Sequence, residues 1–564
     1  MTPPRPGPIV EPAIPRSTEF PAWARWALRA VLLVVPAALA VACLRPMLSA
    51  QGRLGFPMDD PYIHFQYARN LAHGAGFSFN PGEPSPGATS PLWVVLLAAG
   101  NAMGAPLEPW AVVLGILASC AAALLTMEVG RAAGLSTPLA FLAGLATATS
   151  GRMTWGALSG MEVCVAMALA LAAVRMHLSG AHGWKRALGV GALAGLAGQA
   201  RPEAALLGVL LCALEAWRAG RGRGPSGAPG VAVTGRRGSG SPPAVRRSGS
   251  RIAAALRATL PCAAAMIAVM LPYGIFCLAT TGRPFPNTFY AKSLIPLGEG
   301  IAWWNGGRAH YLQEAMLWAF RDNSLLVLLA PGLLLWGFRS RWAGRGAAMR
   351  PLALPLWPLV FWAYALVFFP MHFSLSRYTI PLVPFTALVA MVCLEALQAA
   401  LGSATARRGV ELVAALILVV GATRSQFMGQ ETYRLNVDNI LHMQVAMGEW
   451  VAQNVPPGSK IANNDVGAIT YIGGRYCIDV MGLVSSDFVT ELLERRRAGL
   501  SPYPDDALPG YLDERGPDYC ILFPEWFPDY VRSGRLVPIH EIDYENTTGG
   551  GNQLVVYRFL KRAR

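Results

Sequence analysis

Charged residues are scarce in this 564-residue sequence: they make up 14% of it, whereas soluble domains average about 25%. Hydrophobic residues account for 53%. They gather into blocks of about 20 residues, the length that crosses a bilayer core of roughly 30 Å. One soluble core does not produce many such blocks in close succession. The shortage of charge therefore predicts an integral membrane protein.

Acidic residues are absent between Glu215 and Glu299, although nine arginines lie between Arg218 and Arg257. Gly, Ser and Pro accompany these arginines, which predicts a basic disordered loop over residues 219–256. Because the loop lies between apolar blocks, its charge is most simply explained by the excess of Lys and Arg in cytoplasmic loops. RNA or anionic-lipid binding by the loop is the alternative. We expect membrane lipids, and no nucleic acid, as partners.

The nine cysteines show no metal-binding spacing, and most of them fall in apolar blocks, where cysteine packs as a small hydrophobic residue. Cys477 and Cys520 lie in the predicted soluble part, where an extracytoplasmic location would permit a disulfide. No cofactor is predicted. His64, close to Asp60, leaves a divalent metal open as an alternative.

Membrane spans are predicted over residues 24–424. The block from Trp26 to Leu44 follows three arginines and lacks a small-residue cleavage site, which indicates an uncleaved first span with a cytoplasmic N-terminus. Residues 1–23 are predicted to be disordered. Further blocks centre near residues 97, 120, 143, 167, 192, 209, 269, 331, 360, 388 and 416, for about 12 transmembrane helices. Basic turns then place loops 45–88, 281–322 and 371–377 together on the extracytoplasmic side.

The pattern changes near residue 425. Four strand-like runs (KIANNDVG, YCIDVMGLV, DYCILFP and NQLVVYRFL) alternate with helical stretches. This alternation predicts a small α/β domain over residues 425–564. An odd number of spans would place the domain outside, beside the three loops.

Two adjacent carboxylates, Asp59 and Asp60, follow the first span within the loop 45–88. A transferase with a lipid donor needs a carboxylate near the membrane to take the proton from an acceptor hydroxyl, and either aspartate meets this demand. Asp60 could instead cap the following helix, with Pro61 at its first position. That helix would be short and interfacial, with an apolar stripe of Tyr62, Phe65, Tyr67 and Leu71.

Cationic side chains are predicted at the same face. Lys292, His372 and Arg377 lie in the other two outside loops, where they could stabilise the phosphate that a polyprenyl-phosphate donor leaves behind. Lys292 and Arg377 could equally be anchors that reach the interface. Glu162, Arg201 and Glu203 interrupt apolar surroundings, and ionisable residues at membrane depth are functional candidates. The last two could simply pair with each other.

The stretch DDPYIHFQYARNLAHGAGFSFNPGE, followed by TSPLW, resembles the first loop of bacterial GT-C glycosyltransferases, in particular the arabinofuranosyltransferase-like group. SGMEV, ARPEA, PNTFYAK, SRYTIPLVPF and NDVGAITYIGGRYCIDVMGLV follow in the family's order. The resemblance covers nearly the whole chain. Two positions depart from the family pattern: Pro61 stands where a small residue is usual, and Val163 where Thr is usual.

The resemblance implies a GT-C fold, which is an α-helical polytopic membrane protein with a small C-terminal α/β soluble domain. It also implies inverting transfer of a hexosyl or pentosyl group from a polyprenyl-phosphate sugar to a glycan, lipid or protein acceptor of the cell envelope. The reaction would occur on the outer face of the bacterial inner (cytoplasmic) membrane.

Site roles follow from the same resemblance. The pair Asp59–Asp60 would supply the base, and Lys292 and Arg377 would lie near the donor phosphate. His372 remains a phosphate-binding candidate because of its place in the loop 371–377. The remaining substrate-site candidates are Tyr62, His64, Arg69, Glu83, Glu162, Arg201, Glu203, Tyr290 and Tyr378. A flippase for lipid-linked sugars and a non-catalytic scaffold are the competing functions.

Overall fold

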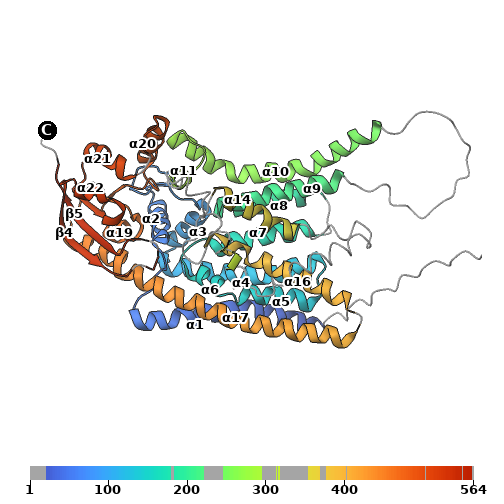
Figure 1. Cartoon of the computed structure of the whole chain (residues 1–564). Coiled ribbons are helices and arrows are strands. Elements are labelled where there is room, and N and C mark those ends of the chain that lie inside the picture. Colours follow the sequence, from blue (N-terminus) through green and yellow to red (C-terminus); the bar gives the residue numbers. More distant parts are fainter. Residues whose placement is uncertain are drawn as a thin grey trace, which may run out of the picture.

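The structure is a computed structural model that describes residues 21–179, 183–220, 245–294, 353–368, 377–401, 403–501, 504–545, 547–548 and 550–561, besides Gln313, Met316 and Leu317. The described part is elongated, with a bundle of helices and a sheet domain at one end (Figure 1). His372, residues 1–20 and residues 221–244 of the predicted basic loop lie outside the described residues. The prediction of disorder was wrong for the end of that loop, because residues 245–256 form the start of a helix (Val245–Thr281).

Apolar helices make up the bundle. Within the described ranges, five segments are long and apolar enough to cross a membrane. They are α1 (Ala22–Gln51), α4 (Leu107–Ala133), the apolar part of α10 (Val245–Thr281), η6 (Arg377–Leu382) with α16 (Val383–Ala400), and α17 (Ala404–Ile440) with the helical turns that follow it. On α17, the side chains of Leu412, Leu416 and Val419 are 64–72% exposed, as expected of a surface that faces lipid.

Shorter helices complete the described bundle: α3 (Pro91–Ala102), α5 (Thr137–Ala148), α6 (Gly151–Leu158), α7 (Val163–Leu178), α8 (Trp184–Ala200), α9 (Ala205–Gly220) and α14 (Ala353–Phe368). Together, α6 and α7 count as a sixth candidate span. The predicted apolar blocks coincide with helices wherever the chain is described, whereas the block near residue 331 lies outside the described residues.

Two breaks in the bundle carry polar residues inward. Between α6 and α7 the chain bends by 115°, and Gly160 adopts a left-handed φ of +72° there. The second break follows α8, where Arg201 is extended (φ −144°, ψ 120°) and Pro202 begins the turn η1 (Pro202–Ala204). An extended conformation is what a following proline imposes on its neighbour. These breaks place Glu162, Arg201 and Glu203 in buried or half-buried positions.

The first loop contains α2 (Asp60–Ala72), which lies with α3 between the bundle and the sheet (Figure 1). The prediction that α2 is interfacial, with an apolar stripe facing lipid, was wrong. Tyr62, Phe65 and Tyr67 are buried inside the protein, and so are His64 and Gln66 on the opposite face. Because the sheet domain covers the loop, α2 is enclosed by protein and does not lie on a lipid surface.

The C-terminal domain holds a five-stranded sheet of order β2-β1-β3-β5-β4. The strands are β1 (Lys460–Asn463), β2 (Tyr476–Asp479), β3 (Tyr519–Leu522), β4 (Leu536–Asp543) and β5 (Gln553–Phe559). Strands β1, β2 and β3 are parallel, whereas β5 runs antiparallel to β3 and β4. Helices α18 (Ala446–Asn454), α19 (Val466–Gly473), α20 (Ser486–Arg497), α21 (Pro504–Arg515) and α22 (Pro528–Arg532) complete the domain, with the turn η8 (Pro524–Trp526).

Cys477 and Cys520 are both free and buried, so the structure does not support the disulfide that the sequence allowed. Cys477 lies opposite Ile461 on β1, and Cys520 lies opposite Ala462 on the other side of the same strand. Two strand spacings of about 4.8 Å separate them, and this distance exceeds the reach of a disulfide.

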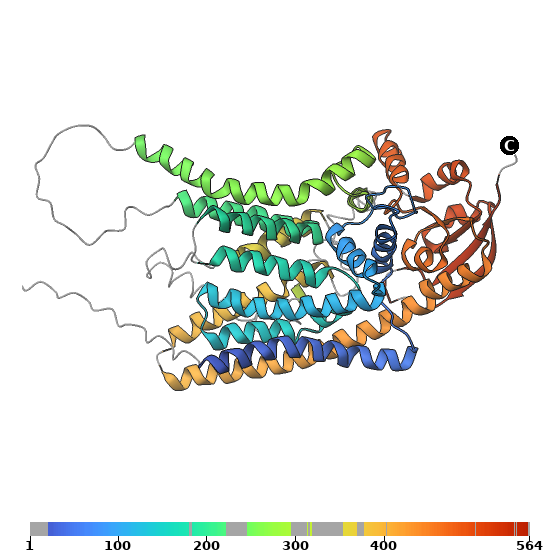
Figure 2. The ribbon, with the colours of Figure 1, turned by 180° about the vertical axis from the view of Figure 1, so that it is seen from behind.

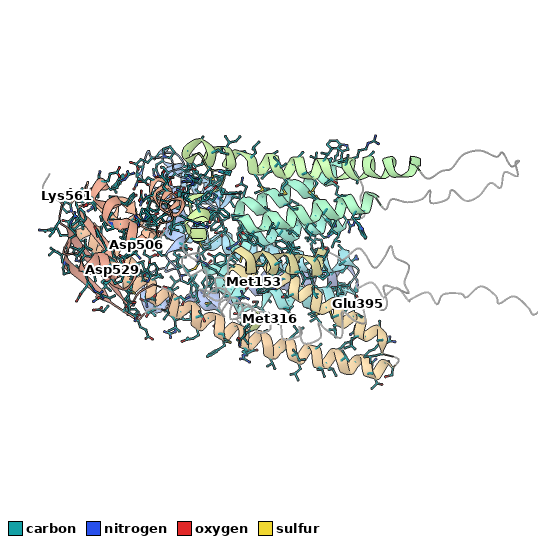
Figure 3. The ribbon with its side chains drawn as sticks, turned by 45° about the horizontal axis from the view of Figure 1, so that its top comes forward. Met153, Met316, Glu395, Asp506, Asp529 and Lys561 are labelled. Carbon is teal, nitrogen blue, oxygen red and sulfur yellow. The ribbon has the colours of Figure 1, made fainter. Side chains whose placement is uncertain are left out.

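Helix α17 crosses the predicted domain boundary at residues 424 and 425 without a break. It continues through a π-helical turn, η7 (Leu441–Val445), into α18. Seen from behind, it runs along the bundle to the sheet (Figure 2). Asp506, Asp529 and Lys561 lie at the sheet end of the molecule, and Glu395 lies towards the opposite end (Figure 3).

Candidate active site

Asp59 faces the sheet domain. Its two carboxylate oxygens accept hydrogen bonds from the backbone N–H groups of Gly467 (2.6 Å) and Ala468 (2.7 Å). These donors belong to the first turn of α19, whose N–H groups have no partner within the helix. The N-cap residue of α19 is Asp465, and its side chain makes no capping hydrogen bond. Asp59 therefore caps a helix about 400 positions away in the sequence, rather than its own helix α2.

A second carboxyl group, Asp465, lies beside Asp59 and is hydrogen-bonded to it. Gln444, in the π-helical turn, donates to Asp465 Oδ2 at 2.7 Å. Burial raises the pKa of Asp59 well above its usual range, and the charge of Asp465 raises it further, against the two backbone N–H donors. Burial also raises the pKa of Asp465. The two carboxyl groups therefore favour sharing a proton at the junction between loop and sheet domain.

Asp60 faces the bundle instead. Its Oδ2 atom lies 2.7 Å from the Arg377 guanidinium, and 32% of its side chain is exposed. Burial alone would raise the pKa of Asp60, but the charges of Arg377, Lys292 and His64 outweigh burial and hold it at about 2. Asp60 is therefore ionised at neutral pH, unlike its neighbour.

Lys292, from α11 (Asn287–Leu294), completes the cationic side of the site. Its Nζ atom lies 3.3 Å from the hydroxyl of Tyr378, which also contacts Arg377 at 3.4 Å. Asp60, Lys292, Arg377 and Tyr378 all line one cavity. In the sequence, Asp60 is 232 positions from Lys292 and 317 from Arg377, and the fold brings the three residues together.

Glu162, Arg201 and Glu203 line the same cavity. Arg201 bridges the other two: its Nη1 atom lies 3.1 Å from Glu162 Oε1, and its Nε atom lies 2.5 Å from Glu203 Oε1. The simple pairing of Arg201 with Glu203 is thus incomplete. The second oxygen of Glu162, Oε2, is buried and has no hydrogen-bond partner in the described structure.

Aromatic and hydroxyl side chains that the sequence did not single out form the rest of the cavity. The aromatic group comprises Phe285, Phe289, Phe361 and Tyr364, from α14 and the region around α11. The hydroxyl group comprises Thr89, Ser90 and Thr288. Ser90 and Thr288 could have been predicted, because they lie in the motifs TSPLW and PNTFYAK. Phe361 and Tyr364 of α14 could not, because no motif or charged residue marks that helix in the sequence.

Five predicted substrate-site residues do not line this cavity. Tyr62 packs among Phe56, Phe65 and Tyr471. Arg69 lies over the ring of Tyr471 and donates to its carbonyl oxygen at 3.0 Å. Both residues therefore join the first loop to the sheet domain.

The other three lie elsewhere. His64 is buried, and its Nδ1 atom lies 3.2 Å from the Asp60 carbonyl oxygen. Tyr290 contacts Arg283. Glu83 lines a second cavity. Among the described residues, no group of three or more His, Cys, Asp or Glu side chains is arranged to hold a metal ion.

The arrangement of bundle, first loop and sheet domain is similar to that of solved membrane glycosyltransferases. ArnT from Cupriavidus metallidurans, solved with bound undecaprenyl phosphate, superposes with a TM-score of 0.56 at 12% identity, covering 95% of this chain and 98% of its own. AglB, an oligosaccharyltransferase from Archaeoglobus fulgidus solved with an inhibitory peptide and a dolichol-phosphate, gives 0.54 at 11% identity, covering 94% and 75%. Both are polyprenyl-phosphate-dependent GT-C enzymes, and the likeness confirms the predicted fold class.

Other comparisons are less informative. The mycobacterial arabinofuranosyltransferase AftD gives a TM-score of 0.43 at 16% identity, covering 96% of this chain and 42% of its own, which is too low to assign a sugar. A family model described as a domain of unknown function (DUF8728) matches residues 435–557, within the C-terminal part. No curated protein matches the sequence.

Proposed function

We propose that the protein is an inverting glycosyltransferase that moves a sugar from a polyprenyl-phosphate donor to an acceptor of the bacterial cell envelope. The observation that carries this proposal is one cavity that unites the ionised carboxylate of Asp60 with the cations Lys292 and Arg377. A base for the acceptor and positive charge for a phosphate leaving group are the two needs of such a transfer.

The donor phosphate is assigned to Arg377 and Lys292. A guanidinium can hold two phosphate oxygens at once, and the ammonium group adds a second charge. The aromatic residues on the same cavity, Phe285, Phe289 and Phe361, offer an apolar surface to the first part of a prenyl chain. The prediction for His372 stays open, because it lies outside the described residues.

Transfer then takes one displacement step. The acceptor oxygen attacks the anomeric carbon and forms the new glycosidic bond, while the bond between that carbon and the phosphate oxygen breaks. Asp60 takes the acceptor's proton. The electron pair of the broken bond goes to the polyprenyl phosphate, where Arg377 and Lys292 stabilise the charge. Attack opposite to the leaving group inverts the anomeric carbon.

Arg377 has two partners in this scheme. Without donor it pairs with Asp60, whose pKa of about 2 makes it a poor base. A phosphate competes with Asp60 for Arg377 and Lys292, which weakens the opposing charge on the carboxylate and raises its basicity. Donor binding thereby prepares the base, and an acceptor that arrives first meets a less reactive Asp60.

The donor sugar is assigned to the neighbourhood of Glu162. Its unpartnered oxygen can accept a hydrogen bond from a sugar hydroxyl, while Arg201 holds the other oxygen in place. No metal is part of the proposal, since the charge on the phosphate is met by side chains. We assign the active site and the sheet domain to the extracytoplasmic face of the inner membrane. The basic loop before α10 is predicted to be cytoplasmic, α10 is long and apolar enough to cross the membrane, and α11 with Lys292 follows at its other end.

The test uses the purified full chain in nanodiscs with a panel of polyprenyl-phosphate sugars, and mass spectrometry follows loss of sugar from the lipid. We expect one donor to be consumed and Asp60→Asn to slow its consumption by about 10²–10⁴-fold, the contribution of a positioned general base. Asp529→Asn is the matched control, since that carboxylate is 86% exposed on the sheet domain.

Full activity of Asp60→Asn would contradict the assignment of the base. If the wild type consumes no donor in the panel but moves labelled lipid-linked sugar between leaflets, the protein is a flippase and the proposal is wrong. Absence of both activities would leave the scaffold function.

A further inference from the structure

A second cavity, of about 280 Å³, lies between the first loop and the sheet domain. Its volume is close to the lower end of the roughly 300–1,000 Å³ that is usual for small-molecule sites. The lining residues come from positions 79–85 and from β2, α20, α21 and the loop before α20. None of the described membrane helices contributes. The cavity is therefore formed by the first loop and the sheet domain alone.

Polar and aromatic side chains alternate around this cavity. Tyr476 donates its hydroxyl to both oxygens of Glu83, at 3.1 and 2.9 Å. Tyr511 donates to Asp487 at 3.0 Å, and Arg515 pairs with the same carboxylate. The result is two carboxylates and one guanidinium held beside two phenol rings. Carboxylates accept hydrogen bonds only, so the cavity favours a ligand that is rich in donors and carries no negative charge.

We infer that this cavity binds the sugar residues of a glycan acceptor. Neighbouring hydroxyls of a sugar can donate to the carboxylate lone pairs of Glu83 and Asp487 that the protein's own contacts leave available, and the apolar face of a sugar ring can pack on a tyrosine ring. The inference rests on the proposed transferase function and specifies its acceptor class, among the glycan, lipid and protein acceptors that the sequence leaves open.

The other acceptor classes fit this cavity less well. A lipid phosphate would meet two carboxylates, and its chains would find none of the described membrane helices there. A peptide acceptor could pair with β2, which is an edge strand of the sheet, but the first loop already occupies that edge. Asn80 donates to the carbonyl oxygen of Cys477 at 2.9 Å and accepts from its N–H at 3.0 Å. The backbone pairing that strand addition requires is thus taken by the first loop.

One segment of the first loop takes part in both cavities. Ser85 lines the second cavity, Ser90 lines the first, and the backbone carbonyls of Pro86 and Gly87 between them accept hydrogen bonds from the start of α11. Asn287 donates its backbone N–H to the Pro86 carbonyl at 2.9 Å and its side-chain amide to the Ser486 hydroxyl at 2.8 Å. The amide oxygen of Asn287 is buried without a partner. A glycan in the second cavity would therefore lie against the same segment of the first loop that lines the active-site cavity.

The test measures direct binding of sugars to the full chain in nanodiscs by saturation-transfer NMR. The probes are methyl glycosides and di- to tetrasaccharides of mannose, galactose, glucose and arabinofuranose, with a pool of dodecapeptides as the comparison. The variant Asp487→Asn with Arg515→Gln changes the cavity pair. The variant Asp529→Asn with Arg532→Gln changes an exposed pair of the same type in the same domain, outside the cavity.

We expect at least one saccharide to bind the wild type and the exposed-pair variant, and the cavity variant to bind it at least tenfold more weakly. Donor hydrolysis without acceptor should be unchanged in the cavity variant. Equal binding to all three proteins, no saccharide binding to the wild type, or binding of peptides alone would overturn the inference. Because binding is measured without donor, failure of the transferase function shows itself separately, as absence of donor consumption.

Discussion

Asp59 and Asp60 are adjacent in the sequence, yet their carboxylates serve different parts of the protein. Asp59 holds the first turn of α19 on the sheet domain, whereas Asp60 pairs with Arg377 in the cavity of the bundle. Successive residues at the start of a helix point about 100° apart, so two aspartates in a row can face two domains. Their environments separate their pKa values in opposite directions.

Asp59→Asn should loosen the sheet domain and leave the chemistry of Asp60 intact. An amide has one acceptor oxygen, so one of the two N–H groups at Gly467 and Ala468 loses its partner, at a cost of about 1–3 kcal/mol. Limited proteolysis should cleave the sheet domain faster in this variant than in Asp60→Asn. The same proteolysis rate in both variants would argue against the capping role.

The carboxyl pair Asp59–Asp465 should make stability depend on pH. Both pKa values are raised in the folded protein, so the folded state binds more protons than the unfolded state above the usual carboxyl pKa. Stability therefore falls as the pH rises through the interval between the unfolded and the folded pKa values. Asp465→Asn should flatten this dependence in thermal unfolding measured from pH 4.5 to 8. An unchanged slope would contradict the pairing.

The pH dependence of turnover should report the two partners of Arg377. In kcat/KM, which reflects the donor-free enzyme, Asp60 with its pKa of about 2 should produce no acid limb between pH 5 and 8. In kcat, measured with bound donor, the limb should move to higher pH. Arg377→Gln should lower kcat by about 10²–10³-fold and bring an acid limb into kcat/KM. Identical profiles for kcat and kcat/KM would contradict the exchange of partners.

Gly467→Ala should destabilise the junction. A Cβ atom at this position would collide with the backbone and carboxylate of Asp59, and such overpacking costs about 1–3 kcal/mol. Gly510→Ala, within α21, is the matched control, because a Cβ atom there has no heavy atom within 4 Å. A thermal shift confined to the first variant is expected in differential scanning fluorimetry.

Turnover should persist in EDTA. The cationic groups beside Asp60 are side chains, and no described cluster of ligands offers a metal site. The rate of donor consumption in excess EDTA should match that of the untreated enzyme within about twofold. Loss of activity that Mg²⁺ or Mn²⁺ restores would contradict this prediction and favour the divalent-metal alternative.

The sequence was most informative where the local pattern of apolar residues determines the secondary structure. Apolar blocks predicted the described helices because a bilayer demands a fixed length of apolar chain. Four of the five strands, β1, β2, β3 and β5, begin at the first residue of a predicted run or one residue after it. The strand β4 was missed, because it contains Pro538 and exposes most of its residues, as an edge strand tolerates.

The candidate site was less predictable, because its roles depend on contacts between distant segments. The residue type of Asp59 gives no sign of a helix about 400 positions away. Glu83 lies in the same loop as Asp60 but faces another cavity, since the sheet domain covers that part of the loop. Tyr62 and Arg69 belong to the stretch that resembles the first loop of GT-C glycosyltransferases, yet they contact Tyr471 and do not line the active-site cavity.

The unbroken passage from α17 through η7 into α18 has a mechanical consequence. A helix without a flexible joint transmits tilt, so any change in the angle of α17 within the bilayer also moves the sheet domain. Helices tilt to match the thickness of the hydrocarbon around them. Bilayer thickness thereby becomes a variable that acts on the separation between the sheet and the membrane surface, and, under the proposed function, on how far an acceptor must extend to reach Asp60.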